Sequence, residues 1–194
     1  MKHVKSLALC LLALALVLAL AGCGGGSRPT GIRAAETPAD DVAEYQPRWR
    51  SHTVDSTQYR KVFLAGTIDM GRSADWQAAL VARFRDSIGG RWLFFNPRRR
   101  EFHASPAEME YQVAWELAHL EAADLIVMNL LGDSRSPISL LEMGLYARSG
   151  KLFVACSPDY YRYDNVRITC RRYGVPLYDS LTALLDDLPQ QSDE

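Results

Sequence analysis

The chain has 194 residues, of which 48% are hydrophobic, so it can form one domain with a sizeable core and carry additional segments. Its 22 Lys and Arg residues nearly balance its 23 Asp and Glu residues. Because nucleic-acid-binding proteins usually carry a basic excess, this composition argues against nucleic acid as a partner.

The first 22 residues have the pattern of an export signal. A lysine-containing start precedes an apolar run over Leu7–Leu20, which is too short to span a bilayer. The run ends in Leu20-Ala21-Gly22-Cys23, which resembles a bacterial lipobox. This resemblance implies that residues 1–22 are removed as a lipoprotein signal peptide and that lipidated Cys23 anchors the protein in the bacterial cell envelope. Gly24, where an Asp would favour inner-membrane retention, favours the periplasmic face of the outer membrane in a Gram-negative host. A plain secretory signal is the alternative.

Residues 23–60 are predicted to form a lipidated, flexible tether. After Cys23 the segment begins Gly-Gly-Gly-Ser and continues with scattered Pro, Ala, Asp and Thr, without a sustained period of 2 or 3.6. Residues 189–194 are predicted to be a polar tail. The folded domain is therefore expected over residues 61–188.

Within this domain, short apolar strands alternate with helices. The predicted strands are 61–66, 92–96, 123–131, 151–156 and 175–178. The predicted helices are 74–88, 106–121, 136–149, one within 157–174, and 180–188. A Ser-Pro pair opens the second and the third of these helices, as a cap and first turn should. Strands that are apolar throughout and alternate with helices predict a five-stranded parallel sheet covered on both faces, an α/β three-layer sandwich.

In such a sheet, ligands bind beyond the carboxyl ends of the strands. The loops at that edge are predicted to be 66–73, 96–105 and 130–137. The first loop approaches a nucleotide-triphosphate-binding motif, but Arg72 replaces the essential lysine and the best neighbouring strand ends in Asn129 instead of an Asp. That function is therefore disfavoured. Arg98-Arg99-Arg100 in the second loop is interpreted as a solvated basic cluster, with phosphate binding as the alternative.

Glu142 is a charged residue within an otherwise apolar stretch of the predicted helix 136–149. It shares a helical arc with apolar Ile138, Leu141, Leu145 and Tyr146. The carboxylate therefore lies either at the rim of the core or in a pocket. Its position about one and a half turns after the loop 130–137 favours the pocket.

Six short motifs in this order resemble the nucleoside 2-deoxyribosyltransferase-like family over nearly all of residues 61–188. They are FLAGTID with Asp75-Trp76, FNPRR, Gln112-x-x-Trp115-Glu116-Leu117, Ala123-Asp124, Ser136-Pro-Ile-Ser-Leu-Leu-Glu142-Met-Gly144 and Tyr163-x-Asn165-Val166. The resemblance implies a flavodoxin-like fold, a tendency to form homo-oligomers and a glutamate nucleophile at Glu142. It also implies cleavage of the N-glycosidic bond of a 2'-deoxynucleoside, or its monophosphate, with transfer of the deoxyribosyl group to another base or to water. No metal and no organic cofactor are expected.

The chemistry suits a carboxylate, which stabilises an oxocarbenium-like centre and forms a covalent ester with it. The apolar arc should strengthen Glu142 as a nucleophile, and the helix N-terminus should keep it ionised. Gly144 is expected to let the sugar approach. The alternative is a rim glutamate whose stem lies on the core.

Glu116 is the second catalytic candidate, as a carboxyl that hands a proton to the departing base. Gln112, Trp115 and His119 lie on the same helical face and are interpreted as a base-recognition surface. An ordinary solvated face is the alternative. In the loop after the first strand, Asp69 is expected to hold a sugar hydroxyl.

Gly66 and Thr67 are expected to line the same loop. For Asp69, helix capping or simple solvation is the alternative to a sugar contact. Ser136 stands where the better-known transferases carry an acid, which leaves room for an altered substrate. A non-catalytic nucleoside- or nucleotide-binding lipoprotein is the alternative function. For Cys156 and Cys170, pairing and separate burial both remain open.

Overall fold

The computed structural model describes residues 41–101, 103 and 105–188; the leader, Cys23, residues up to 40 and the tail lie outside the described residues. The strands are β1 (Val42–Gln46), β2 (Trp49–Arg50), β3 (Arg60–Gly66), β4 (Trp92–Phe95), β5 (Leu125–Leu130), β6 (Leu152–Cys156) and β7 (Leu177–Tyr178). The helices are α1 (Trp76–Ser87), α2 (Pro106–Ala122), α3 (Pro137–Tyr146), α4 (Tyr163–Tyr173) and α5 (Leu181–Asp187), with short 3₁₀ turns η2 (Ser56–Gln58) and η3 (Asp69–Gly71).

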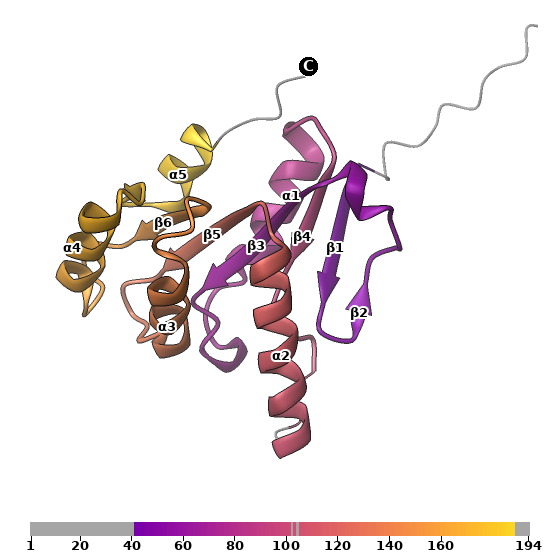
Figure 1. Cartoon of the computed structure of the whole chain (residues 1–194), viewed down its shortest axis with the longest axis horizontal. Coiled ribbons are helices and arrows are strands. Elements are labelled where there is room, and N and C mark those ends of the chain that lie inside the picture. The colour runs from indigo at the N-terminus through magenta and orange to yellow at the C-terminus, as the bar shows by residue number, and fades with distance from the viewer. Residues whose placement is uncertain (1–40, 102, 104, 189–194) are drawn as a thin grey trace, which may run out of the picture. The chain divides into compact units, whose positions relative to one another are not determined.

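The strands form one sheet in the order β2-β1-β4-β3-β5-β6-β7 (Figure 1). All neighbouring strands run parallel except β1 and β2, which form an antiparallel hairpin. All five predicted strands are present. The predicted α/β class with a flavodoxin-like, mostly parallel sheet is therefore confirmed.

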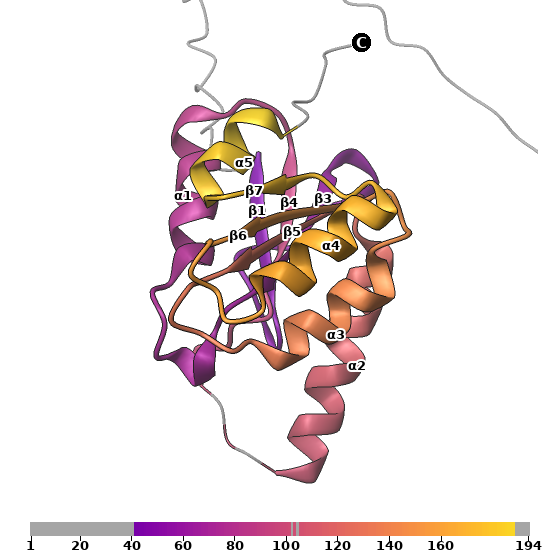
Figure 2. The same cartoon turned by 90° about the vertical axis from the view of Figure 1, so that its left-hand side faces the viewer.

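Helices cover both faces of the sheet, which gives the predicted three layers. Figure 2 shows α2, α3 and α4 on one face and α1 and α5 on the other. The first face buries Leu120, Met143 and Val166 against the strands, and the second buries Phe84 and Leu184. The central strands β4, β3, β5 and β6 are largely apolar on both sides because neither face of the sheet meets water there.

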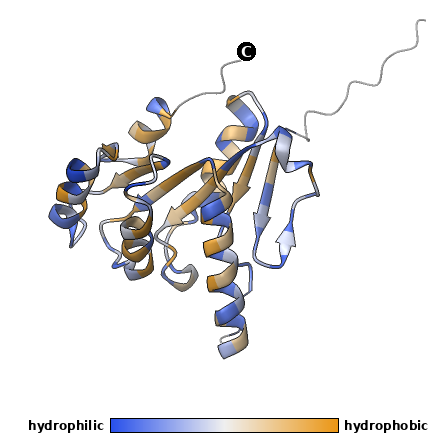
Figure 3. Cartoon of the chain, viewed as in Figure 1, coloured by the Kyte–Doolittle hydropathy of each residue, from blue (hydrophilic) through white to orange (hydrophobic). Residues whose placement is uncertain are grey.

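The prediction of a flexible tether is wrong for residues 42–50, and the sheet has seven strands rather than five. β1 pairs in parallel with β4, from Val42 opposite Trp92 to Tyr45 opposite Phe95. Val42 packs into one core and Ala43 into the other. The strand is only five residues long and contains Glu and Gln, and Figure 3 shows β1 and β2 as hydrophilic relative to the central strands. Such a short, polar edge segment carries no sustained periodicity.

Within the described residues, none of the helices is both long and apolar enough to cross a membrane. Cys156 and Cys170 are free, buried thiols. Burial raises the pKa of the Cys156 thiol to about 12. This supports the interpretation of Cys156 as a packed core residue.

Candidate functional site

The floor of the candidate site forms where β3 and β5 end side by side. Gly66 pairs with Asn129 and has a φ of +126°. A Cβ on Gly66 would lie 2.2 Å from the backbone oxygen of Asn129, so only glycine fits there. The backbone N–H of Thr67 then donates to the same oxygen at 2.9 Å, which turns the chain away from the sheet.

A chain of side-chain hydrogen bonds joins the loop after β3 to the loop after β5. The hydroxyl of Ser134 donates to Asp69 Oδ1 at 3.0 Å, and it lies 2.7 Å from the hydroxyl of Ser136. The Ser136 hydroxyl lies 2.8 Å from that of Thr67, whose oxygen accepts from the backbone N–H of Leu131 at 3.1 Å. The two loops are thereby held as one unit.

Ser136 behaves differently from the expected helix cap. It has a left-handed backbone, with φ 38°, and its side chain makes no capping hydrogen bond to α3. Pro137 still occupies the first turn, as predicted. Because the hydroxyl is committed to Thr67 and Ser134, the first turn of α3 is presented to the cavity described next without a side-chain cap.

These loops, together with α2 and α3, enclose a cavity of about 390 Å³, which we call the carboxyl pocket. Its walls come from residues 66–72, Pro97, one face of α2 and the first turns of α3. Five predicted site residues line it: Gly66, Asp69, Gln112, Glu116 and Glu142. The two candidate catalytic carboxyls thus face a common cavity at the predicted edge of the sheet.

Glu142 is buried in this pocket, with only 8% of its surface exposed. Burial, and secondly the nearby charge of Glu116, raises the pKa of the Glu142 carboxyl to about 8. No hydrogen bond or ion pair to its side chain is present among the described residues. The expectation that the helix N-terminus keeps Glu142 ionised therefore finds no support, because the effect of burial on its pKa is the larger one.

Of the four apolar residues expected beside Glu142, three are exposed, whereas Tyr146 is partly buried against the core. Ile138, Leu141 and Leu145 have 59%, 61% and 57% of their surface accessible. Glu142 is thus more buried than these apolar neighbours on its helical arc. This arrangement contradicts the alternative of a rim glutamate resting on the core.

Glu116 is held by its neighbour one helical turn earlier. The side-chain N–H of Gln112 donates to Glu116 Oε1 at 2.8 Å and to the backbone oxygen of Pro97 at 3.0 Å. Burial raises the pKa of Glu116, and the hydrogen bond from Gln112 offsets part of this increase. Gln112 Oε1 is buried and has no partner among the described residues. The amide therefore fixes the position of the Glu116 carboxyl.

The other predicted residues lie elsewhere. Thr67 is fully buried beneath the pocket, where its hydroxyl ties the loops together. Trp115 stacks on His119, with ring centroids 4.0 Å apart, and packs against Phe63. Gly144 lines a different groove, between α3 and α4, so the expected close approach of a sugar there finds no support. Cys23 lies outside the described residues.

Several lining residues were missed by the sequence analysis. Met109 and Val113 lie on the same face of α2 as Gln112 and Glu116, and they form part of the pocket wall. Their spacing of three and four residues could have revealed them. Arg72 also lines the pocket, and the sequence analysis noted it only for failing the triphosphate-binding motif. Among the described residues, no group of three His, Cys, Asp or Glu side chains could hold a metal.

Comparison with known families agrees with this architecture. Residues 59–160 match the family described as nucleoside 2-deoxyribosyltransferase like. No curated protein matches the chain. The matched range includes β3 to β6, α1 to α3, and both carboxyls of the pocket. Because the match covers more than half of the chain, the chain belongs to this family.

Proposed function

Taking that family membership as the premise, we propose that the chain cleaves the N-glycosidic bond of a 2'-deoxynucleoside or its monophosphate. The deoxyribosyl group then passes to another base or to water. One observation carries the proposal: two carboxyls, Glu142 and Glu116, line one pocket, and the charge of Glu116 helps to raise the pKa of Glu142. Most enzymes that cleave a glycosidic bond use two carboxyls, one as the acid and the other as the nucleophile or base.

In the first step, an oxygen of ionised Glu142 attacks C1' of the deoxyribosyl group. The C1'–N bond breaks, and its electron pair leaves with the base. The base takes a proton from the neutral carboxyl of Glu116, which becomes a carboxylate. The product is a glycosyl ester on Glu142. Burial raises the pKa of Glu116, which helps this carboxyl to hold the proton that it donates.

In the second step, a nitrogen of the incoming base, or a water oxygen, attacks the same carbon. The bond from C1' to Glu142 breaks, and its electron pair returns to the carboxylate. The attacking group gives its proton to Glu116, which restores the starting state. The Asp69 carboxylate and the uncapped first turn of α3 lie in the pocket walls, where they are available to a sugar hydroxyl.

The active arrangement requires Glu142 to lose its proton while Glu116 keeps one. With the pKa of Glu142 raised to about 8, burial works against this arrangement near neutral pH. The positive charge that develops at C1' favours the ionised form of Glu142, because the two charges meet where water is excluded. Bound substrate is therefore expected to favour ionised Glu142, the form that attacks C1'.

The test is product analysis with the purified full chain. A panel of deoxynucleosides and their 5'-monophosphates is incubated with and without a second free base, and products are resolved by chromatography. Glu142→Gln runs in parallel, with Glu110→Gln as the matched control on an exposed position of α2. A new nucleoside that forms only with the second base, and not with Glu142→Gln, indicates a transferase. Free base without an acceptor indicates a hydrolase.

A non-catalytic nucleoside- or nucleotide-binding protein is the second candidate. The raised pKa of Glu142 favours it, because a neutral carboxyl donates a hydrogen bond to a ligand but attacks no carbon. No product from any member of the panel, with a deoxynucleoside still raising the melting temperature of the wild type and of Glu142→Gln, would select this function.

We also propose that Cys23 anchors the protein to the bacterial cell envelope, on the lipobox pattern alone. The test is incorporation of radiolabelled palmitate in cells that express the full chain. Wild type should be labelled and sediment with membranes, whereas Cys23→Ala should be unlabelled. Label in Cys23→Ala would contradict the anchor.

A further inference from the structure

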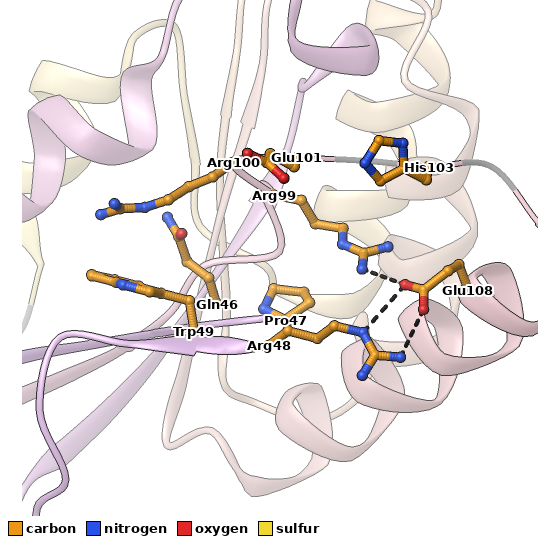
Figure 4. A pocket seen from close by; sticks show the side chains of 9 residues that line it. All are labelled: Gln46, Pro47, Arg48, Trp49, Arg99, Arg100, Glu101, His103 and Glu108. Atoms are coloured by element: carbon orange, nitrogen blue, oxygen red, sulfur yellow. Dashed lines mark hydrogen bonds and ion pairs between the residues drawn. The ribbon is translucent and has the colours of Figure 1, made fainter.

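A second cavity, of about 410 Å³, lies at the hairpin that the sequence analysis missed (Figure 4). We call it the arginine cavity. It is lined by residues 46–49 of the β1–β2 hairpin, residues 99–101 and 103 after β4, and Glu108 in the first turn of α2. The hairpin precedes the range that matches the family, so one wall of this cavity is added to the matched fold.

One side of the cavity is a fixed ionic cluster. Two guanidinium N–H groups of Arg48 donate to Glu108 at 2.7 and 3.3 Å, and Arg99 donates to the same carboxylate at 2.5 Å. These bonds hold the pKa of Glu108 at about 2, so the carboxylate remains charged. Arg48 also lies over the ring of Tyr111, 4.1 Å from its centroid. Contacts with Glu108 and Tyr111 therefore hold the guanidinium of Arg48 in place without a ligand.

The opposite side carries a third guanidinium. That of Arg100 lies 4.0 Å from the centroid of the Trp49 ring, and Figure 4 shows it across the cavity from Arg48 and Glu108. Arg100 forms no ion pair with a carboxylate in the part of the chain that the structure describes. The expectation of a solvated basic cluster at residues 98–100 is wrong for Arg98 and Arg99, whose side chains are 11% and 9% exposed. The alternative of phosphate binding therefore applies to this loop.

The lining residues give the cavity a positive character. Three guanidinium groups face two carboxylates, those of Glu101 and Glu108, and Glu108 is already engaged. Guanidinium groups on opposite walls can bind different oxygens of one phosphoryl group, which offers three in a tetrahedral array. A carboxylate offers only two, in one plane. Trp49 and Pro47 add apolar surface.

We propose that the arginine cavity binds a small molecule that carries a phosphoryl group. The phosphoryl oxygens bind Arg100 and the outer N–H groups of Arg48, and the organic part packs on Pro47 and Trp49. A volume of about 410 Å³ accommodates a ligand larger than inorganic phosphate. The proposal does not depend on catalysis in the carboxyl pocket.

The test uses phenyl phosphate, with phenol as the uncharged counterpart, titrated into the full chain by calorimetry at low ionic strength. Wild type should bind phenyl phosphate saturably and phenol at least tenfold more weakly. Arg100→Gln should weaken phenyl phosphate at least tenfold, and Arg100→Lys should fall between, because it keeps the charge but loses the planar fork. Arg171→Gln, which removes the same charge from an exposed position on α4, should stay within twofold of wild type.

Two further measurements make the result specific. Glu142→Gln should bind phenyl phosphate within twofold of wild type, because the carboxyl pocket is not involved. An unchanged melting temperature in Arg100→Gln shows that weaker binding is not a folding defect. The proposal is overturned if wild type shows no saturable binding, or if Arg100→Gln binds as wild type does. It is equally overturned if Glu142→Gln abolishes binding while Arg100→Gln preserves it.

Discussion

The carboxyl pocket and the arginine cavity have similar volumes and share the segment after β4 and the start of α2, but they treat charge in opposite ways. In the first, Glu142 is buried without an ionic partner in the described part of the chain, and its pKa rises to about 8. In the second, Glu108 accepts hydrogen bonds from both Arg48 and Arg99, and its pKa falls to about 2.

The opposite pKa shifts indicate different roles for the two carboxyls: Glu142 is expected to act on a ligand, and Glu108 to stabilise the fold. An ionised carboxylate buried without a partner destabilises the folded state, so a protein retains it where something else requires it. A carboxylate bound by two guanidinium groups stabilises the junction of the hairpin and α2. Glu142 is therefore expected to control activity and Glu108 to control stability.

Removing the nucleophile should give the largest effect. Glu142→Gln is expected to lower kcat/KM by about 10³-fold or more, because the amide forms no glycosyl ester. Initial rates of base release measure this. Glu110→Gln should remain within twofold of wild type. Comparable rates for Glu142→Gln and wild type would show that the unpaired carboxyl is not the nucleophile.

Glu116→Gln should have the next largest effect, a loss of about 10²-fold in kcat for an ordinary base. The amide cannot hand a proton to the departing base, so a base that leaves readily as an anion should lose much less. The pH midpoint of kcat/KM, governed by Glu142, should also move down from about 8, since the nearby charge of Glu116 helps to raise that pKa. A uniform loss for all bases, with an unmoved midpoint, would reduce Glu116 to a structural role.

The stability of the carboxyl pocket should depend on pH. The folded state binds the proton of Glu142 more tightly than the unfolded state does, because its pKa rises from 4.5 to about 8. This stabilisation is fully present below pH 4.5 and is lost as the pH rises through 8. Relative to Glu142→Gln, the wild type should therefore lose about 4 kcal/mol of unfolding free energy between pH 5 and 9. Urea denaturation at several pH values measures the difference, and parallel curves for the two proteins would refute it.

The fold was largely predictable because its central strands are buried on both faces. Runs such as residues 61–66 and 151–156 are apolar throughout, and the Ser-Pro pairs mark two helix starts from local chemistry alone. The β1–β2 hairpin was not predictable in the same way. Its strands are short, β2 forms the edge of the sheet, and β1 joins the sheet through β4, far along the chain.

The site was predictable where a helix or a strand end fixed the geometry. The spacing of Gln112 and Glu116 placed both on one face of α2, and the end of β3 placed Gly66 and Asp69 beside them. The environment of Glu142 was not predictable. Whether the helix N-terminus or burial has the larger effect on the pKa of Glu142 depends on which side chains pack around it. Only the structure shows that three apolar neighbours of Glu142 are exposed.

The smallest effect on activity is expected from Glu108→Gln. This variant removes the charge shared by Arg48 and Arg99, so it should weaken the hairpin while kcat/KM changes by less than about twofold. The pH dependence has the opposite sign from that of Glu142. The pKa of Glu108 is lowered from 4.5 to about 2, so its contribution is present above 4.5 and is lost as the pH falls through 2. The stability advantage of the wild type over Glu108→Gln should therefore be constant near neutral pH and shrink between pH 4.5 and 2. Thermal unfolding of both proteins across this range measures it, and an advantage that grew on acidification would mean that the guanidinium groups do not hold the carboxylate.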